Sequence, residues 1–137
     1  MNRTISPGTI KGKVHAPTSK SMMQRAVALS ILSDHDVEIF YPSLCDDGKQ
    51  ALSIAESFGK KVQHKERSVV LSGEPVITNN HMNVGESGLG IRLFSAIAGL
   101  FDKKITLDGT GSLRKRPIKN SEESLQKFSF KEGSSAW

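Results

Sequence analysis

The feature that most constrains the fold of this chain is an internal repeat of about 67 residues. A polar turn, an arginine and an apolar helical segment occur twice, with Arg25 and Arg92 lying 67 positions apart. The apolar stretches that follow, centred near Val37 and Ile105, are 68 positions apart. Repeated supersecondary units bury their apolar faces against one another. The repeat therefore predicts a strand-helix-strand-helix-strand-strand unit followed by the first part of a second unit.

Hydrophobic spacing and turn residues predict the elements of the first unit. Thr18 and Ser19 are suitable caps for its first helix, and Gly59 is suited to end its second. Apolar residues cover most of the first helix, which predicts that this helix is largely buried. The expected elements are a strand over Thr9–His15, this helix over Lys20–Ser33, a strand over Val37–Tyr41, an amphipathic surface helix over Asp46–Phe58 and a hairpin of Lys61–His64 with Ser68–Ser72.

The second unit is predicted to be incomplete. Beyond Phe130 the sequence has no periodic pattern, so we expect a domain over residues 1–130 and a disordered or artificial tail over 131–137. The expected elements are an extended segment over Val76–Val84, an apolar helix over Leu89–Phe101, a strand over Lys104–Leu107, a turn at Asp108–Gly111 and a short amphipathic helix over Ser121–Phe128.

Composition narrows the class of protein. The 137 residues suggest one domain, and the low aromatic content of 6% requires an aliphatic core. A single cysteine excludes an intramolecular disulfide framework and a multi-cysteine metal site. The sequence has no apolar run long enough to cross a bilayer and no visible signal peptide, so the expected location is the cytoplasm.

The positive charge points to an anionic partner. The chain has 19 Lys and Arg against 14 Asp and Glu, a formal charge of +5. Nucleic-acid binding by base stacking needs exposed aromatic side chains, and the chain has one Tyr and one Trp. We therefore expect small phosphorylated or carboxylated ligands rather than nucleic acid.

The first candidate anion site lies at the start of the helix predicted over Lys20–Ser33. Lys20 falls in its first turn, where free backbone N–H groups and the helix dipole favour an anion. Ser21 and Arg25 are four residues apart and share a helix face. A capped helix with solvated charges explains the same residues equally well, so residue chemistry alone leaves both interpretations open.

Two later clusters have similar chemistry. The segment Gly85–Gly88 precedes the second apolar helix, with Arg92 one turn inside that helix. Glycines allow backbone N–H groups to approach a ligand closely. However, a short glycine-containing segment is more often an ordinary turn than a ligand site. Arg116 ends the basic run Arg114–Arg116, which is more often a solvated face. However, Pro117 restricts Arg116 to an extended conformation, which suits capture of a carboxylate or phosphate.

Other reactive residues are interpreted as structural. Asp46 and Asp47 are interpreted as acidic residues at a helix N-terminus rather than as acid–base groups. Cys45 has no base beside it in the sequence and is expected to be a packed thiol. The histidines have no metal-ligand spacing and are expected on the surface: His15, His35, His64 and His81.

Taken together, four motifs resemble the 5-enolpyruvylshikimate-3-phosphate (EPSP) synthase family in order and spacing. They occupy Ala16–Ala26, Cys45–Asp47, Gly85–Leu93 and Gly109–Pro117. The resemblance implies an α/β fold of βαβαββ units in which helices pack inside and sheets face outward. This chain would hold one full unit and part of a second, from the N-terminal domain of a longer enzyme.

The resemblance also implies a reaction and residue roles. Members transfer the enolpyruvyl group of phosphoenolpyruvate to shikimate 3-phosphate and release phosphate, with no metal or organic cofactor. Lys20 would touch both substrates and is the catalytic candidate. By the same motif matches, Ser21 and Arg25 would bind shikimate 3-phosphate, whereas Gly88 and Arg116 would bind phosphoenolpyruvate.

Several positions depart from the family pattern or match it without a substrate role. Asp47 and Arg92 match motif positions but are interpreted as framework. The family has Gly, Asn and Thr where this chain has Thr18, Glu86 and Leu89. An acid at position 86 is expected to weaken anion binding unless the carboxylate is paired or turned away.

The chain is expected to hold only half of a substrate site. Hydrogen bonds from half a site barely offset the cost of association, so we predict binding at about the millimolar level at best. The chain has no convincing acid–base group, so we predict no catalysis by the chain alone. Two alternatives remain open at this stage. One is a related enzyme, such as a UDP-N-acetylglucosamine enolpyruvyl transferase or an RNA 3′-phosphate cyclase. The other is a non-catalytic anion-binding or assembly module that self-associates through exposed edges.

Overall fold

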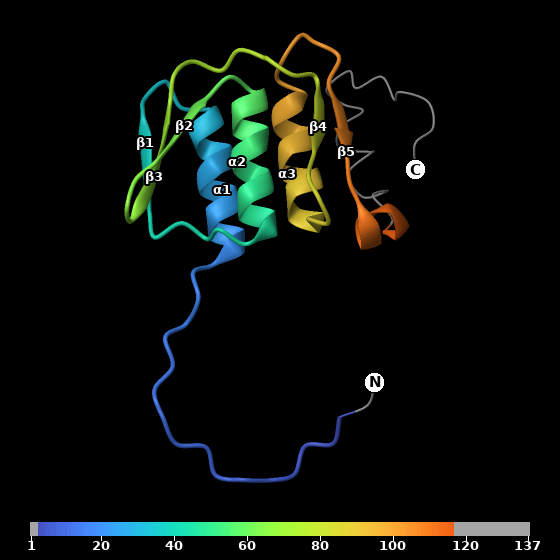
Figure 1. Cartoon of the computed structure of the whole chain (residues 1–137). Helices are drawn as coiled ribbons and strands as arrows, with labels where there is room; N and C mark the ends of the chain where they lie inside the picture. Colours follow the sequence, from blue (N-terminus) through green and yellow to red (C-terminus); the bar gives the residue numbers. More distant parts are fainter. Residues whose placement is uncertain (1–2, 117–137) are drawn as a thin grey trace.

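Three helices stand side by side between two small sheets in the computed structural model, which describes residues 3–116 (Figure 1). In chain order the elements are α1 (Lys20–Ile31), β1 (Val37–Phe40), α2 (Asp46–Ser57), β2 (Lys61–His64), β3 (Ser68–Ser72), β4 (His81–Asn83), α3 (Gly88–Ala98), β5 (Thr106–Asp108) and the 3-10 turn η1 (Gly111–Lys115).

Local sequence signals set the helix ends. The Ser19 hydroxyl accepts a hydrogen bond from the Met22 N–H (3.3 Å) and caps α1, and Ser87 caps α3 in the same way. Helix α2 begins with two acidic residues and is followed by Gly59, whose φ of 92° is in the left-handed region. The cap at Ser19 and the glycine after α2 agree with the sequence prediction, whereas the cap at Ser87 was not predicted.

The two sheets are built differently. In the first, the antiparallel order is β1-β3-β2, with β2 and β3 forming the expected hairpin. In the second, β4 and β5 pair in parallel and are joined through α3. Figure 1 shows the helices between these sheets, so the predicted arrangement of helices inside and sheets outside is confirmed.

The core is aliphatic, as the composition requires. Helices α1 and α2 make the most extensive helix contact, and α1 also packs against α3. The Phe58 and Phe101 rings lie 5.2 Å apart between centroids. The largest side chains with almost no exposure are Phe58, Phe94, Ile31, Ile54, Leu71, Met82, Ile91 and Leu113.

The predicted strand over Thr9–His15 is wrong. Residues 3–19 have no regular secondary structure, and Ile10 and Val14 are almost fully exposed. A strand needs a neighbour to satisfy its backbone N–H and C=O groups. Among the described strands none pairs with this segment, and β1 pairs only with β3. Alternating hydrophobicity signals a strand but does not supply its partner.

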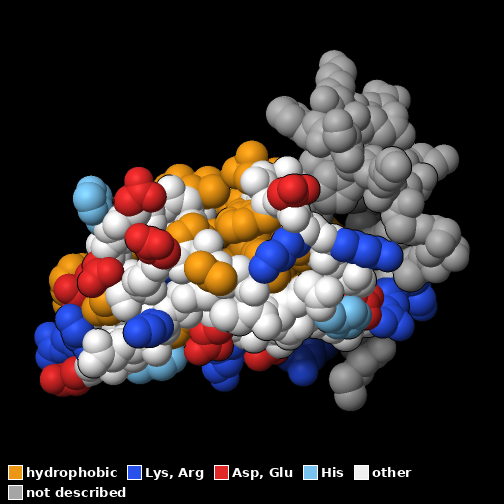
Figure 2. Space-filling view, turned by 90° about the horizontal axis from the view of Figure 1, so that it is seen from above, with side chains coloured by type: hydrophobic (Ala, Val, Ile, Leu, Met, Phe, Trp, Pro, Cys, Tyr) orange, Lys and Arg blue, Asp and Glu red, His pale blue; other side chains and the backbone are white. Residues whose placement is uncertain are grey.

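The burial predicted for the first helix is only partly correct. Met22, Leu29 and Leu32 are exposed, Leu29 by 67%, and Leu100 is exposed beyond the end of α3. Among residues 3–116 these side chains leave an apolar face largely exposed. Figure 2 shows apolar side chains gathered at the surface on the end of the molecule viewed there. The face contains an apolar groove of about 580 Å³ between α1 and α3.

Three expectations fall outside the described residues: the helix over Ser121–Phe128, the domain boundary at residue 130 and the tail over 131–137. Within residues 3–116, the structure contains no helix with the length and apolar character needed to span a membrane.

Candidate anion-binding site

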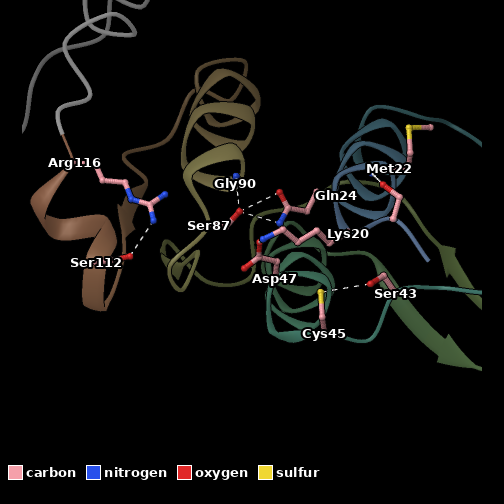
Figure 3. Close-up of polar contacts among 11 residues, drawn as sticks. Lys20, Met22, Gln24, Ser43, Cys45, Asp47, Ser87, Gly90, Ser112 and Arg116 are labelled. Atoms are coloured by element: carbon pink, nitrogen blue, oxygen red, sulfur yellow. Dashed lines mark hydrogen bonds and ion pairs between the residues drawn. The ribbon is translucent and has the colours of Figure 1, made fainter. Parts of the chain in front are cut away.

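The N-terminal ends of α1 and α3 meet the turn η1 at a polar cavity of about 620 Å³ (Figure 3). Two helix N-termini and three basic side chains favour anions at this place. The lining residues are Lys20, Ser21, Gln24, Asp47, Glu86, Ser87, Gly88, Leu89, Arg92, Ser112 and Arg116.

Lys20 is held by an acid from the neighbouring helix. Its Nζ lies 3.0 Å from Oδ2 of Asp47, and the hydrogen bond and charge of Asp47 raise the pKa of Lys20. Lys20 is therefore a cation at neutral pH. Asp47 lies in the first turn of α2, as the helix-cap interpretation expects, and in addition fixes the direction of this ammonium group.

Glu86 is paired rather than free in the cavity. Its Oε2 accepts a hydrogen bond from the Ser112 N–H (2.9 Å), and hydrogen bonds from the Ser112 hydroxyl and N–H lower the pKa of Glu86. The charge of Arg116 acts in the same direction. Gly111 makes this contact possible, since a Cβ there would collide with the Glu86 carboxylate. The acid that sequence reasoning regarded as unfavourable instead anchors η1.

Two guanidinium groups flank the first residue of α3. Arg116 has the predicted extended backbone, and its Nη2 donates to the Ser112 hydroxyl (3.1 Å). Nη1 of Arg92 donates to the Gly88 carbonyl (2.7 Å). A Cβ on Gly88 would lie 3.2 Å from Nη1 of Arg116 and 3.5 Å from Nη1 of Arg92. The glycine therefore leaves room for both cations beside the backbone.

A buried amide forms part of the cavity floor. Gln24 of α1 is 1% exposed, and its Nε2 lies 2.9 Å from the Ser87 hydroxyl (Figure 3). Ser87 also accepts a hydrogen bond from the Gly90 N–H (2.9 Å). This connection joins the two repeats directly below the start of α3.

The structure brings four of the five candidate residues to one cavity: Lys20, Ser21, Gly88 and Arg116. Arg25 is not among its lining residues. The Arg25 side chain lines the apolar groove instead, with Nη1 3.8 Å from the Met22 sulfur. Arg92, interpreted as framework from the sequence, lines the cavity, whereas Arg25 does not.

Sequence reasoning missed Gln24, Ser87 and Ser112 as residues of the cavity. One signal was available for Ser87, which lies 68 positions after the cap Ser19 and precedes the second apolar helix. Gln24 gave no signal, because a single amide in an apolar helix does not indicate which residue it meets.

Cys45 is exposed, so the prediction of a packed thiol is wrong. It lies at the N-cap of α2, and the hydrogen bond from the Ser43 hydroxyl, together with the Gly48 and Asp47 N–H groups, lowers the pKa of Cys45. The four histidines are exposed, as expected. Over residues 3–116 no group of three or more His, Cys, Asp or Glu side chains is arranged to hold a metal ion.

Fold and cavity together define an α/β protein whose repeated helix N-termini are suited to phosphate and carboxylate groups. Residues 5–131 match the EPSP synthase (3-phosphoshikimate 1-carboxyvinyltransferase) family. The chain belongs to this family.

Individual relatives agree. The chain is 32% identical over 127 residues to the 3-phosphoshikimate 1-carboxyvinyltransferase of Chlamydia felis, covering 90% of this chain. It is 36% identical over 120 residues to that of Methanosarcina acetivorans, covering 85%. It spans 28% of the length of each relative. An EPSP synthase structure from Acinetobacter baumannii superposes with a TM-score of 0.70 at 21% identity, covering 85% of this chain and 27% of that chain; this likeness supports the fold.

Proposed function

We propose that this chain supplies one side of the substrate site for transfer of a carboxyvinyl group from phosphoenolpyruvate to shikimate 3-phosphate. In that reaction a hydroxyl oxygen of shikimate 3-phosphate bonds to the carboxyvinyl carbon, its proton is lost and inorganic phosphate leaves. The observation that carries the proposal is the polar cavity, because all four motif segments contribute residues to its lining.

The charges around the cavity support binding of anions. Both acids are engaged, Asp47 with Lys20 and Glu86 with the Ser112 N–H. A guanidinium group has five N–H donors. Arg92 uses one on the Gly88 carbonyl and Arg116 uses one on the Ser112 hydroxyl. The remaining donors match the carboxylate and phosphate oxygens of phosphoenolpyruvate.

The residue roles implied by the family motifs are compatible with this distribution. Gly88 and Arg116 bind phosphoenolpyruvate, and Ser21 binds shikimate 3-phosphate from the α1 side. Lys20 is the catalytic candidate between them. Because Asp47 raises the pKa of Lys20, its ammonium group stabilises negative charge on the departing phosphate and does not accept a proton. Arg25 reaches shikimate 3-phosphate only if its side chain leaves the contact with Met22.

The chain alone is proposed to bind weakly and to turn over no substrate. It spans 28% of the length of its relatives, and the acids lining the described cavity are committed to structural contacts. We propose that residues 1–130 form part of the N-terminal domain of the enzyme and that 131–137 are a tail. The cytoplasmic location remains a prediction from the sequence.

Calorimetric titration of the full 137-residue chain with each substrate tests the proposal. We expect weak saturable binding at about the millimolar level, lost in Lys20→Ala. Lys49→Ala removes the same charge from an exposed position outside the cavity and should bind like the wild type. No saturation at tens of millimolar ligand, or equal loss in both variants, would contradict the proposal. Release of phosphate by the isolated chain would contradict its predicted inactivity.

A second candidate function is self-association as an assembly module. The exposed apolar groove between α1 and α3 favours it, since apolar faces of this kind mark interaction surfaces. Sedimentation of the chain over a range of concentrations should show reversible dimerisation. Leu29→Glu, on the exposed face of α1, should abolish it, and a mass independent of concentration would exclude this candidate.

A further inference from the structure

The most buried polar contact of the cavity lies below it and links the two repeats. Gln24 comes from α1 and Ser87 from the start of α3, and the two residues are 63 positions apart. The Ser87 hydroxyl lies 2.9 Å from Nε2 and 3.1 Å from Oε1 of Gln24 (Figure 3). Both side chains are almost fully buried, so loss of either partner would leave a polar group without its contact.

Ser87 has more contacts than its counterpart in the first repeat. Ser19 caps α1 through one hydrogen bond from Met22 and is exposed. Ser87 caps α3 through the Gly90 N–H and is also bound by Gln24. The Ser87 hydroxyl thus holds the start of α3 through two partners, one of them on α1.

The residue that needs this support is Gly88. It has no side chain to anchor it, yet its backbone lies beside the guanidinium groups of Arg92 and Arg116. The loop before it is fixed on both sides. Glu86 holds η1 through Ser112, whereas Ser87 is held by Gln24 on α1.

We propose that Gln24 is a positioning residue for the phosphoenolpyruvate side of the cavity. Its amide fixes the distance of Ser87 from α1. Because Gly88 follows Ser87, this contact also sets where the Gly88 backbone lies relative to Lys20 and Ser21 in the cavity. The inference rests on the proposed function for its substrate, but the mechanical link between Gln24 and the start of α3 is testable without any ligand.

Gln24→Met tests this link in the full chain, because methionine has nearly the same length and cannot replace the amide hydrogen bonds. Hydrogen–deuterium exchange of the segment Val84–Ile91 should become about tenfold faster. Phosphoenolpyruvate binding should weaken about tenfold, measured by calorimetry. Ser87→Ala should have the same two effects, and the double variant should be no worse than the more severe single variant.

Ser30→Ala provides the matched control. Ser30 is a buried hydroxyl on α1 bonded to the Val27 carbonyl (2.7 Å), away from the cavity. It should lower thermal stability without changing exchange at the start of α3. Ser87→Thr keeps a hydroxyl cap and should restore slow exchange and binding, so the test does not depend on one variant folding.

The outcomes separate this inference from the proposed function. Unchanged exchange in Gln24→Met and Ser87→Ala would overturn the inference, whatever the ligand does. Faster exchange with normal phosphoenolpyruvate binding would overturn it as well, because Gln24 would then be structural only. Faster exchange in a chain whose wild type binds neither substrate would support the link and contradict the proposed function.

Discussion

The N-terminal ends of α1 and α3 are built on the same plan and differ in what they present. Each helix begins after a capping serine and has an arginine in its first or second turn. Helix α1 begins with Lys20, a cation fixed by Asp47, whereas α3 begins with Gly88, which leaves its backbone open beside two guanidinium groups. At its first residue, α1 therefore contributes a charged side chain to the cavity, whereas α3 contributes open backbone.

The arginines differ because the two repeats are out of register by one residue. The caps Ser19 and Ser87 are 68 positions apart, whereas Arg25 and Arg92 are 67 apart. One residue turns the side-chain direction by about 100° on an α-helix. Arg92 consequently lines the cavity, and Arg25 lines the apolar groove. A repeat that conserves the scaffold can thus change which side chain enters the site.

The largest expected effect is a difference in stability between variants of the two capping serines. Ser87→Ala should lower the free energy of unfolding by about 2–3 kcal/mol, because it removes a cap and leaves the buried Gln24 amide without its partner. Ser19→Ala should cost about 1 kcal/mol. Urea denaturation of both variants measures the difference. Equal losses would show that the two helix ends are equivalent after all.

Removing the Arg116 guanidinium group tests the side of the cavity where the Gly88 backbone lies. Arg116→Ala should weaken phosphoenolpyruvate binding about thirtyfold, since hydrogen bonds to charged groups contribute about 1.5–3 kcal/mol. Lys115→Ala removes a neighbouring exposed charge that does not line the cavity and should have little effect. Calorimetry compares them. Similar losses in both variants would mean that overall charge, and not the aimed side chain, attracts the ligand.

A smaller effect is expected at Glu86. Glu86→Gln keeps an oxygen that can accept from the Ser112 N–H but removes a negative charge from the cavity. Phosphoenolpyruvate binding should strengthen about threefold, a gain typical of removing one partly screened like charge. Weaker binding would instead show that the ionised carboxylate is needed to hold η1 and Arg116 in place.

The smallest effect is the pH dependence of the same contact. The pKa of Glu86 is lowered on folding by hydrogen bonds from Ser112. The ionised carboxylate therefore stabilises the fold above its unfolded pKa, and this contribution is lost as pH falls through the lower folded pKa. Thermal melting should show wild type more stable than Glu86→Gln at neutral pH and the two converging in acid. A constant difference across this range would contradict the assignment.

Several features of this protein were determined by the sequence itself, because they depend on contacts within a few residues. The caps Ser19 and Ser87, the glycine after α2, the hairpin of β2 and β3 and the extended backbone of Arg116 all follow from such short-range geometry. The order and spacing of four motifs also indicated the family, and this resemblance implied that Lys20, Ser21, Gly88 and Arg116 lie in one substrate site.

Only the tertiary structure decided the contacts between distant segments. The pairing of Gln24 with Ser87, the ion pair of Lys20 with Asp47 and the exposure of one face of α1 depend on how neighbouring elements pack. The same is true of Thr9–His15, whose alternating pattern is not realised because a strand is stabilised only by the strand beside it. Long-range partners are set by the packing of the whole fold, and a local pattern carries no information about their distance or direction.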